Sequence, residues 1–126
     1  MKRNKLCELE TIYDIAKWHA ETFPDATLEG QIDKYAEEQR EFIDSKYKDV
    51  AELADMFIVA CGMTRFDAFT AIWYLKDVYD WMEECTIAER DVEHAVAKKM
   101  AINRHRVWEK KGGLYKHTAL KKRSAK

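Results

Sequence analysis

The chain has 126 residues, of which 47% are hydrophobic and 36% are charged, with one proline and four glycines. This length suits one compact domain, and a composition poor in turn-forming residues suits helices better than a β-sandwich. The formal net charge is −1, so no overall field draws the chain to nucleic acid or to a membrane. Cys7, Cys61 and Cys85 are widely spaced and form no CxxC pair, which predicts reduced thiols in the cytoplasm and no thiolate zinc site.

Apolar residues at three- and four-residue spacing predict three helices in the first half of the chain. The first covers residues 8–22 and stops near Pro24, which cannot continue a helix. The second covers residues 27–45 and opens on a threonine N-cap. The third covers residues 48–62, is apolar nearly all round and takes a glycine as its C-terminal stop.

Two more helices are predicted in the second half. Residues 67–84 form the fourth, whose broad apolar face indicates burial on two sides. Thr86 and Glu89 have the spacing of a capping box and would open the fifth helix. That helix is expected to continue to about Lys111 and to end at Gly112-Gly113.

These segments predict an all-α protein, a bundle of about five helices with a four-helix core. We expect residues 1–113 to form this domain and residues 114–126 to form a basic C-terminal tail without a clear period. The third and fourth helices carry more apolar face than one short bundle can cover, so we also expect a homo-oligomer, at least a dimer. The apolar runs are too short to span a membrane.

Polar residues that share a helix face indicate where the chemistry lies, because successive helical residues rotate by about 100° around the axis. On the third helix, Glu52 and Asp55 interrupt a surface that is otherwise apolar. On the second helix, a glutamine, a lysine and two glutamates form a strip along the edge of the core face: Gln31, Lys34, Glu38 and Glu41.

Converging carboxylates are costly to bury unless they are neutralised, paired or bound to a metal ion. Oxygen ligands without cysteine or histidine favour a hard cation, Mg²⁺ with Mn²⁺ as a possible substitute. Protein-bound Mg²⁺ is usually shared between a few carboxylates, water and substrate phosphates, which indicates a polyphosphate ligand.

The fifth predicted helix supports an anionic ligand independently. Its core-facing stripe begins with Val92 and Val96 and continues as Lys99, Asn103 and Arg106. Cations on an inward face need an anionic partner, and a triphosphate matches several such donors better than a lone carboxylate does.

Simpler interpretations remain open for each of these features. Glu38 and Glu41 could belong to a solvated helix face, and Glu52 and Asp55 could form buried ion pairs with basic residues of the fifth helix. The four tryptophans are more often core residues than base-stacking platforms, and neither His19 nor His117 is assigned to the metal. The tryptophans concerned are Trp18, Trp73, Trp81 and Trp108. The presence of both the acidic and the basic pattern in one chain favours a functional site.

The order Glu37-Glu38-x-x-Glu41, Glu52-x-x-Asp55, Lys99-x-x-x-Asn103-x-x-Arg106 resembles the MazG-like all-α nucleoside triphosphate pyrophosphohydrolases. The resemblance covers most of the chain and includes the segment Phe23-Pro24-Asp25-Ala26-Thr27 with Gln31 and Lys34. One departure is the stretch between Glu41 and Glu52, which is short and leaves only a tight turn between the helices.

The resemblance implies a dimer or tetramer that uses Mg²⁺ to cleave (d)NTP between the α and β phosphates, giving (d)NMP and pyrophosphate in nucleotide-pool control. By motif, the metal ligands would be Glu38, Glu41, Glu52 and Asp55. The catalytic candidates would be Glu37 and Glu38, with Glu37 serving for positioning or as general base. The substrate-binding residues would be Gln31, Lys34, Lys99, Asn103 and Arg106.

Two rival functions come from other classes. A small helical nucleic-acid-binding or regulatory protein could use the basic tail to contact phosphates, but the acidic residues would then have no purpose. A structural oligomerisation module would explain the apolar faces but not the polar end of the fifth helix. Neither alternative accounts for both charged patterns.

Overall fold

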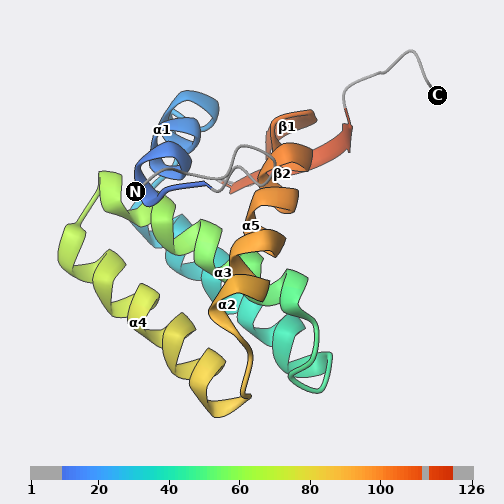
Figure 1. The fold of residues 1–126 in the computed structure, drawn as a ribbon. Helices are drawn as coiled ribbons and strands as arrows, with labels where there is room; N and C mark the ends of the chain where they lie inside the picture. Colours follow the sequence, from blue (N-terminus) through green and yellow to red (C-terminus); the bar gives the residue numbers. More distant parts are fainter. Residues whose placement is uncertain (1–9, 112–113, 121–126) are drawn as a thin grey trace, which may run out of the picture.

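The computed structural model describes residues 10–111 and 114–120 and contains five α-helices followed by a β-hairpin (Figure 1). The expected all-α class is confirmed for the helical body, with the helices in the predicted order. Their bounds are α1 (Ile12–Thr22), α2 (Leu28–Asp44), α3 (Val50–Gly62), α4 (Ala68–Glu84) and α5 (Glu89–Asn103), and a 3₁₀ turn, η2 (Met63–Arg65), joins α3 to α4.

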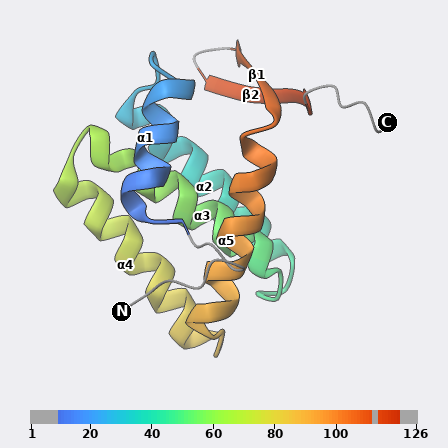
Figure 2. The ribbon, with the colours of Figure 1, turned by 45° about the horizontal axis from the view of Figure 1, so that its top comes forward.

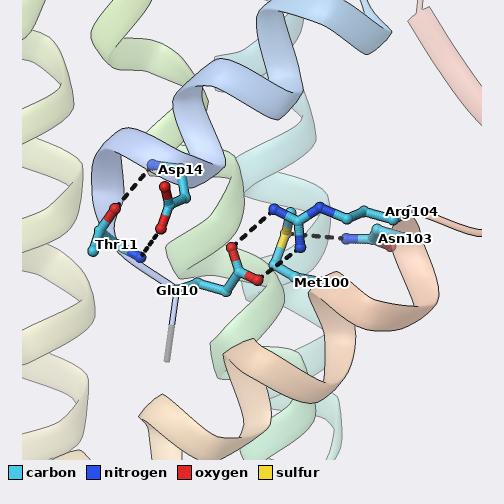
Figure 3. A network of polar contacts seen from close by, with 6 residues as sticks. All are labelled: Glu10, Thr11, Asp14, Met100, Asn103 and Arg104. Atoms are coloured by element: carbon cyan, nitrogen blue, oxygen red, sulfur yellow. Dashed lines mark hydrogen bonds and ion pairs between the residues drawn. The ribbon is translucent and has the colours of Figure 1, made fainter. Parts of the chain in front are cut away.

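Side-chain caps fix where the first four helices begin. At the start of α1, Thr11 and Asp14 form a capping box in which each side chain accepts from the other's backbone N–H (Figure 3). Thr27 caps α2 as predicted, and Asp49 and Asp67 cap α3 and α4. Each cap satisfies a backbone N–H that has no partner within its own helix.

The predicted capping box of Thr86 and Glu89 is wrong. The N-cap of α5 is Ala88, which offers no side-chain oxygen. Thr86 instead has a left-handed φ of 56°, and its N–H donates to the carbonyl of Glu83 while the N–H of Ile87 donates to that of Met82. These two bonds form a Schellman motif, so Thr86 serves the end of α4 and not the start of α5.

The expected continuation of the fifth helix to Lys111 is also wrong. The helix α5 ends at Asn103, and β1 (Arg106–Lys111) then pairs antiparallel with β2 (Leu114–Leu120). The sequence between the strands is Gly112-Gly113, a pair that favours short hairpin loops as much as helix ends. The glycine pair therefore separates two strands and does not follow a helix.

The hairpin includes residues on both sides of the boundary expected between residues 113 and 114. Residues 114–120 of the expected basic tail form the strand β2. The rest of that tail, residues 121–126, lies outside the described residues.

The helix α3 is the centre of the bundle and packs against α1, α2, α4 and α5. Most of its length is buried, as its apolar sequence predicts, so a polar side chain on it meets other helices before it meets bulk water. Its buried residues are Leu53, Ala54, Met56, Ile58, Val59, Ala60, Cys61 and Gly62.

The outer face of α4, by contrast, leaves large apolar side chains exposed. Phe69 and Trp73 are 84% and 71% exposed, and Ile72 and Tyr79 lie beside them on the same side of the helix. The predicted burial of this helix on two sides is thus incomplete within one chain.

Among the helices that the structure describes, none has the length and apolar character that a membrane span requires.

A bidentate ion pair ties the start of α1 to the end of α5. The two guanidinium nitrogens of Arg104 lie 2.7 and 2.9 Å from the carboxylate oxygens of Glu10 (Figure 3). The hairpin continues from this end of α5, and Figure 2 shows it at the same end of the bundle as α1. Sequence segments about 90 residues apart therefore lie together.

Gly62 allows α1 to approach α3 closely, and α3 ends at this residue as predicted, but without a left-handed glycine cap. Its φ of −65° is helical, and the chain continues directly into η2. A Cβ at this position would lie 2.8 Å from Cδ2 of His19, which is closer than side chains pack. The missing side chain is therefore the space that the His19 ring occupies.

Replacing Gly62 with alanine tests this packing. We expect Gly62→Ala to lower the free energy of unfolding by about 1–2 kcal/mol, the usual cost of overpacking less the gain in helix propensity. Urea denaturation would measure it. In a His19→Ala background the methyl group has room, so the loss should disappear. An equal loss in both backgrounds would show that the ring is not the obstacle.

Candidate functional site

All ten residues predicted for the site line one cavity of about 370 Å³. The cavity lies among α1, α2, α3, α5 and the start of β1. It contains the acidic strip of α2, the acidic pair of α3 and the polar end of α5. The predicted residues are Gln31, Lys34, Glu37, Glu38, Glu41, Glu52, Asp55, Lys99, Asn103 and Arg106.

A tight turn between α2 and α3 brings the two acidic helices together, as the short Glu41–Glu52 spacing predicts. Lys46 and Tyr47 both adopt left-handed φ values, of 68° and 63°. The Tyr47 ring stacks on Trp81 with ring centroids 5.5 Å apart, which holds the turn against α4. The turn reverses the chain, so the carboxylates of α2 face those of α3.

Three carboxylates form the acidic centre of the cavity. Glu38 and Glu41, one turn apart on α2, and Glu52 on α3 each have an oxygen within 4.8 Å of the others. Asp55 lies one turn further along α3 and lines the same cavity. This arrangement crowds negative charge where water is partly excluded, which is unfavourable unless protons or cations are present.

Glu38 is the most constrained of these groups. Glu38 is 8% exposed, and its Oε1 has no hydrogen-bond partner among the described residues. Burial, reinforced by the neighbouring charges of Asp55, Glu41 and Glu52, raises the pKa of Glu38 to about 8, although Lys34 acts in the opposite direction. Without a bound cation, this environment therefore favours the protonated form of the carboxyl.

Glu52 has a similar environment. Its Oε1 is buried and lacks a partner in the part of the chain that the structure describes. Burial, a hydrogen bond with Glu41 and the charge of Asp55 raise the pKa of Glu52 above its ordinary value. Two buried carboxylate oxygens without partners, close to a third carboxylate, fit a hard divalent cation with oxygen ligands.

Basic side chains border the acidic centre. The Lys99 ammonium lies 3.1 Å from Asp55, and the Lys34 ammonium lies 3.4 Å from Glu38 and 3.8 Å from Glu37. The pKa of Asp55 is raised by its burial, a shift that Lys99, Arg106 and Lys34 each reduce. The ion pair between Asp55 and Lys99, the alternative left open by the sequence, is present in this structure.

Asn103 and Arg106 lie near the end of α5, but on different elements. Asn103 is the last residue of the helix, is 7% exposed, and donates to the sulfur of Met100 at 3.8 Å (Figure 3). Arg106 is the first residue of β1. The prediction that it continues the stripe of the fifth helix is therefore wrong. Arg106 reaches the cavity because the chain turns at residues 104 and 105.

The other end of the cavity is aromatic, which the sequence analysis did not predict. Trp18 and Phe23 come from α1 and the residue after it, and Trp108 comes from β1. Their rings meet edge to face, with the Phe23 and Trp108 centroids 4.9 Å apart and the Trp18 and Trp108 centroids 6.2 Å apart. His19 also lines this end. The sequence offered Trp18 and Trp108 as possible base-stacking residues, but both were assigned to the core, and the wrong helix assignment gave no reason to place Trp108 beside Trp18.

The comparisons with known proteins give one informative relative. The chain is 31% identical over 112 residues to a protein of Salmonella phage PMBT28 named dATP/dGTP diphosphohydrolase. The match covers 85% of this chain and 31% of the relative, so the chain spans about a third of the relative's length. A matched segment of this length includes α2 to α5 wherever it begins in the chain.

Neither a protein-family model nor a solved structure matches the chain significantly. The similarity to the phage protein therefore supports, at the level of sequence, the resemblance to nucleotide pyrophosphohydrolases.

The pH dependence of stability tests the electrostatics of Glu38. Its raised pKa means that the folded protein holds a proton that the unfolded chain releases between about pH 4.5 and 8, so stability falls as pH rises through that window. We expect Glu38→Gln, without metal, to raise the melting temperature at pH 8 and to raise it much less at pH 5. Thermal denaturation in chelator would measure both values.

Glu37→Gln is the matched control, because it removes the same charge from a neighbouring side chain that is 43% exposed. Its effect should be small and similar at the two pH values. A Glu38→Gln protein no more stable than wild type at pH 8 would contradict the proposed burial cost.

Proposed function

We propose that this protein is a Mg²⁺-dependent nucleoside triphosphate pyrophosphohydrolase that converts (d)NTP to (d)NMP and pyrophosphate. The observation that carries the proposal is one cavity with cations at its border, aromatic rings at one end and, at its centre, buried carboxylate oxygens that have no partner among the residues described. A nucleoside triphosphate has the matching parts: phosphates that take cations and a base that packs on aromatic rings.

The metal would be held by Glu38, Glu41 and Glu52, with Asp55 as a fourth ligand from the next turn of α3. When bound, Mg²⁺ would offset the charge of the phosphates and make a water molecule more acidic. The relevant property of the chain is that it holds these carboxylates together before the ion arrives, at the cost reflected in the raised pKa of Glu38. Mn²⁺, which prefers similar ligands, would be a substitute.

The remaining polar residues would position the substrate. Lys99 and Arg106 would donate to phosphate oxygens, and Lys99 would then leave or share its contact with Asp55. Glu37, which is near Lys34 at the border of the cavity, would position substrate or act as general base, a role for which Glu38 is the other candidate. The phage relative named as a dATP/dGTP diphosphohydrolase supports a purine deoxynucleotide as the first substrate to test.

The decisive assay is incubation with a mixed nucleotide pool and Mg²⁺, followed by detection of monophosphate and pyrophosphate. We expect Glu52→Gln and Asp55→Asn each to reduce the rate by orders of magnitude, and chelation to abolish it, because a small hard ion tolerates the loss of an oxygen ligand poorly. Glu21→Gln, on the exposed side of α1 and away from the cavity, is the control and should be normal. Normal rates for both cavity variants would sink the metal assignment.

We also propose a homodimer or homotetramer that buries the exposed face of α4. Phe69, Trp73 and their neighbours form an apolar stripe that is costly to leave in water. We expect sedimentation to show at least a dimer at micromolar concentration and Trp73→Glu to dissociate it. Tyr13→Glu, at an equally exposed aromatic residue of α1, should not. A wild-type protein that sediments only as a monomer would refute this proposal.

A further inference from the structure

A cation outside the cavity binds the chain at the end of α1. Arg65, the last residue of η2, does not line the cavity. Its Nη1 donates to the carbonyl of Phe23 at 2.8 Å, and its Nη2 donates to that of Pro24 at 3.3 Å. Nη1 also lies 3.0 Å from Nδ1 of His19 and 3.4 Å from the carbonyl of the same residue. One guanidinium therefore binds the last turn of α1 and the two residues that follow it.

The end of a helix is a favourable place for such a cation. The last carbonyls of a helix lack partners within it and carry a partial negative charge. A guanidinium presents several N–H donors in one plane and can bind more than one of these oxygens at once. The Arg65 guanidinium also lies over the Phe66 ring, 4.7 Å from its centroid. Arg65 therefore links η2, which follows α3, to the end of α1.

Hydrogen bonds within the turn after α1 have a different effect. The N–H of Phe23 donates to the carbonyl of His19 at 2.8 Å, and the N–H of Ala26 donates to the carbonyl of Phe23 at 3.1 Å. Both bonds join residues close in sequence, so they fix the shape of the turn. Pro24 has no N–H with which to add another bond. The bonds from Arg65 span 42 and 41 residues, so they fix where the turn lies relative to η2.

The ring of Phe23 connects this link to the cavity. Phe23 is 6% exposed and lines the aromatic end. Its ring meets those of Trp18 and Trp108 edge to face, with centroids 5.3 and 4.9 Å away. Both tryptophans are partly exposed, so they can contact a ligand, whereas Phe23 is the buried ring against which both pack. A displaced Phe23 backbone would therefore move the ring and change how the two tryptophans lie.

We propose that Arg65 is a positioning residue for the nucleoside part of the ligand, acting through the Phe23 ring on the two tryptophans that hold the base. The inference rests on the proposed function for the identity of the ligand, a nucleoside triphosphate. The phosphates would bind at the acidic centre and its basic border, which Arg65 does not contact through the turn after α1. Arg65 therefore sets the affinity for the nucleoside and takes no part in the bond cleavage itself.

The indole N–H signals of the nucleotide-free protein test the first step. In ¹⁵N-labelled Arg65→Met, the signals of Trp18 and Trp108 should move, because a displaced phenyl ring changes its ring current on both. The signals of the two tryptophans of α4 should stay in place and show that the bundle is intact. Arg90→Met, at an exposed arginine of α5 that does not line the cavity, is the matched control and should leave Trp18 and Trp108 unmoved. Unmoved Trp18 and Trp108 signals in Arg65→Met would overturn the proposal.

Kinetics and binding test the second step, with dATP as the substrate. Arg65→Met should raise KM about three- to tenfold, the scale of one weakened aromatic contact, with a smaller change in kcat. Its affinity for inorganic tripolyphosphate, measured by calorimetry, should equal that of wild type, because this ligand has no base. Arg90→Met should leave both values unchanged. An unchanged KM for dATP in Arg65→Met, or an equal loss of tripolyphosphate affinity, would overturn the proposal.

A double variant tests whether Arg65 acts through Phe23. In a Phe23→Leu background, Arg65→Met should raise KM much less than in wild type, because the ring is already lost. Equal rises in the two backgrounds would refute this route. If Arg65→Met does not fold, Arg65→Lys replaces it in every measurement. Its ammonium is a point charge without the planar fork, so the same changes are expected at smaller size, and no change would overturn the proposal.

The outcomes also separate this inference from the proposed function. Moved Trp18 and Trp108 signals in a protein that neither binds nor hydrolyses nucleotide would refute the proposed function and support the placement of the rings by Arg65. Unmoved signals, or an unchanged KM, in an active enzyme would overturn the inference and leave the proposed function intact.

Discussion

The burial of α3 is the constraint on which the rest of the structure depends. Four other helices pack around it, and most of its residues are removed from water. Glu52 and Asp55 are therefore carried into the protein by the apolar residues that surround them in sequence. Once there, they face Glu38 and Glu41 across a turn too short to let α2 and α3 separate. The raised pKa values of Glu38 and Glu52 follow from this conflict between hydrophobic packing and charge.

The two acidic residues of α3 differ in how their charge is balanced. Asp55 has the Lys99 ammonium 3.1 Å away, whereas Glu52 has a buried oxygen with no partner among the described residues. Lys34 approaches Glu38 from one side only and leaves its Oε1 without a partner in the same part of the chain. The cavity is thus partly neutralised by its own cations, and the unbalanced part is where a divalent cation fits best.

The aromatic end of the cavity depends on contacts between distant parts of the chain. Gly62 makes room for the His19 ring, and Arg65 then binds that ring and the backbone beyond α1. Trp108 reaches Trp18 and Phe23 because the chain leaves the helical path after Asn103. The same end of the bundle is fixed by the ion pair of Glu10 with Arg104. Small changes in this region would alter the shape of the cavity and leave its acidic centre in place.

The sequence by itself determined the helical body and the acidic strip. Helical spacing follows from local geometry, so the N-cap Thr27 and the shared faces of Glu38 with Glu41 and of Glu52 with Asp55 could be derived one helix at a time. Only the tertiary structure decided that β1 and β2 form a hairpin. Strands are stabilised by contacts between two paired segments, and the periodicity of one segment taken alone does not reveal such contacts. It also decided the roles of Gly62 and Arg65. Both act on His19, more than 40 residues away along the chain, and a close approach between helices leaves no periodic signal in either one.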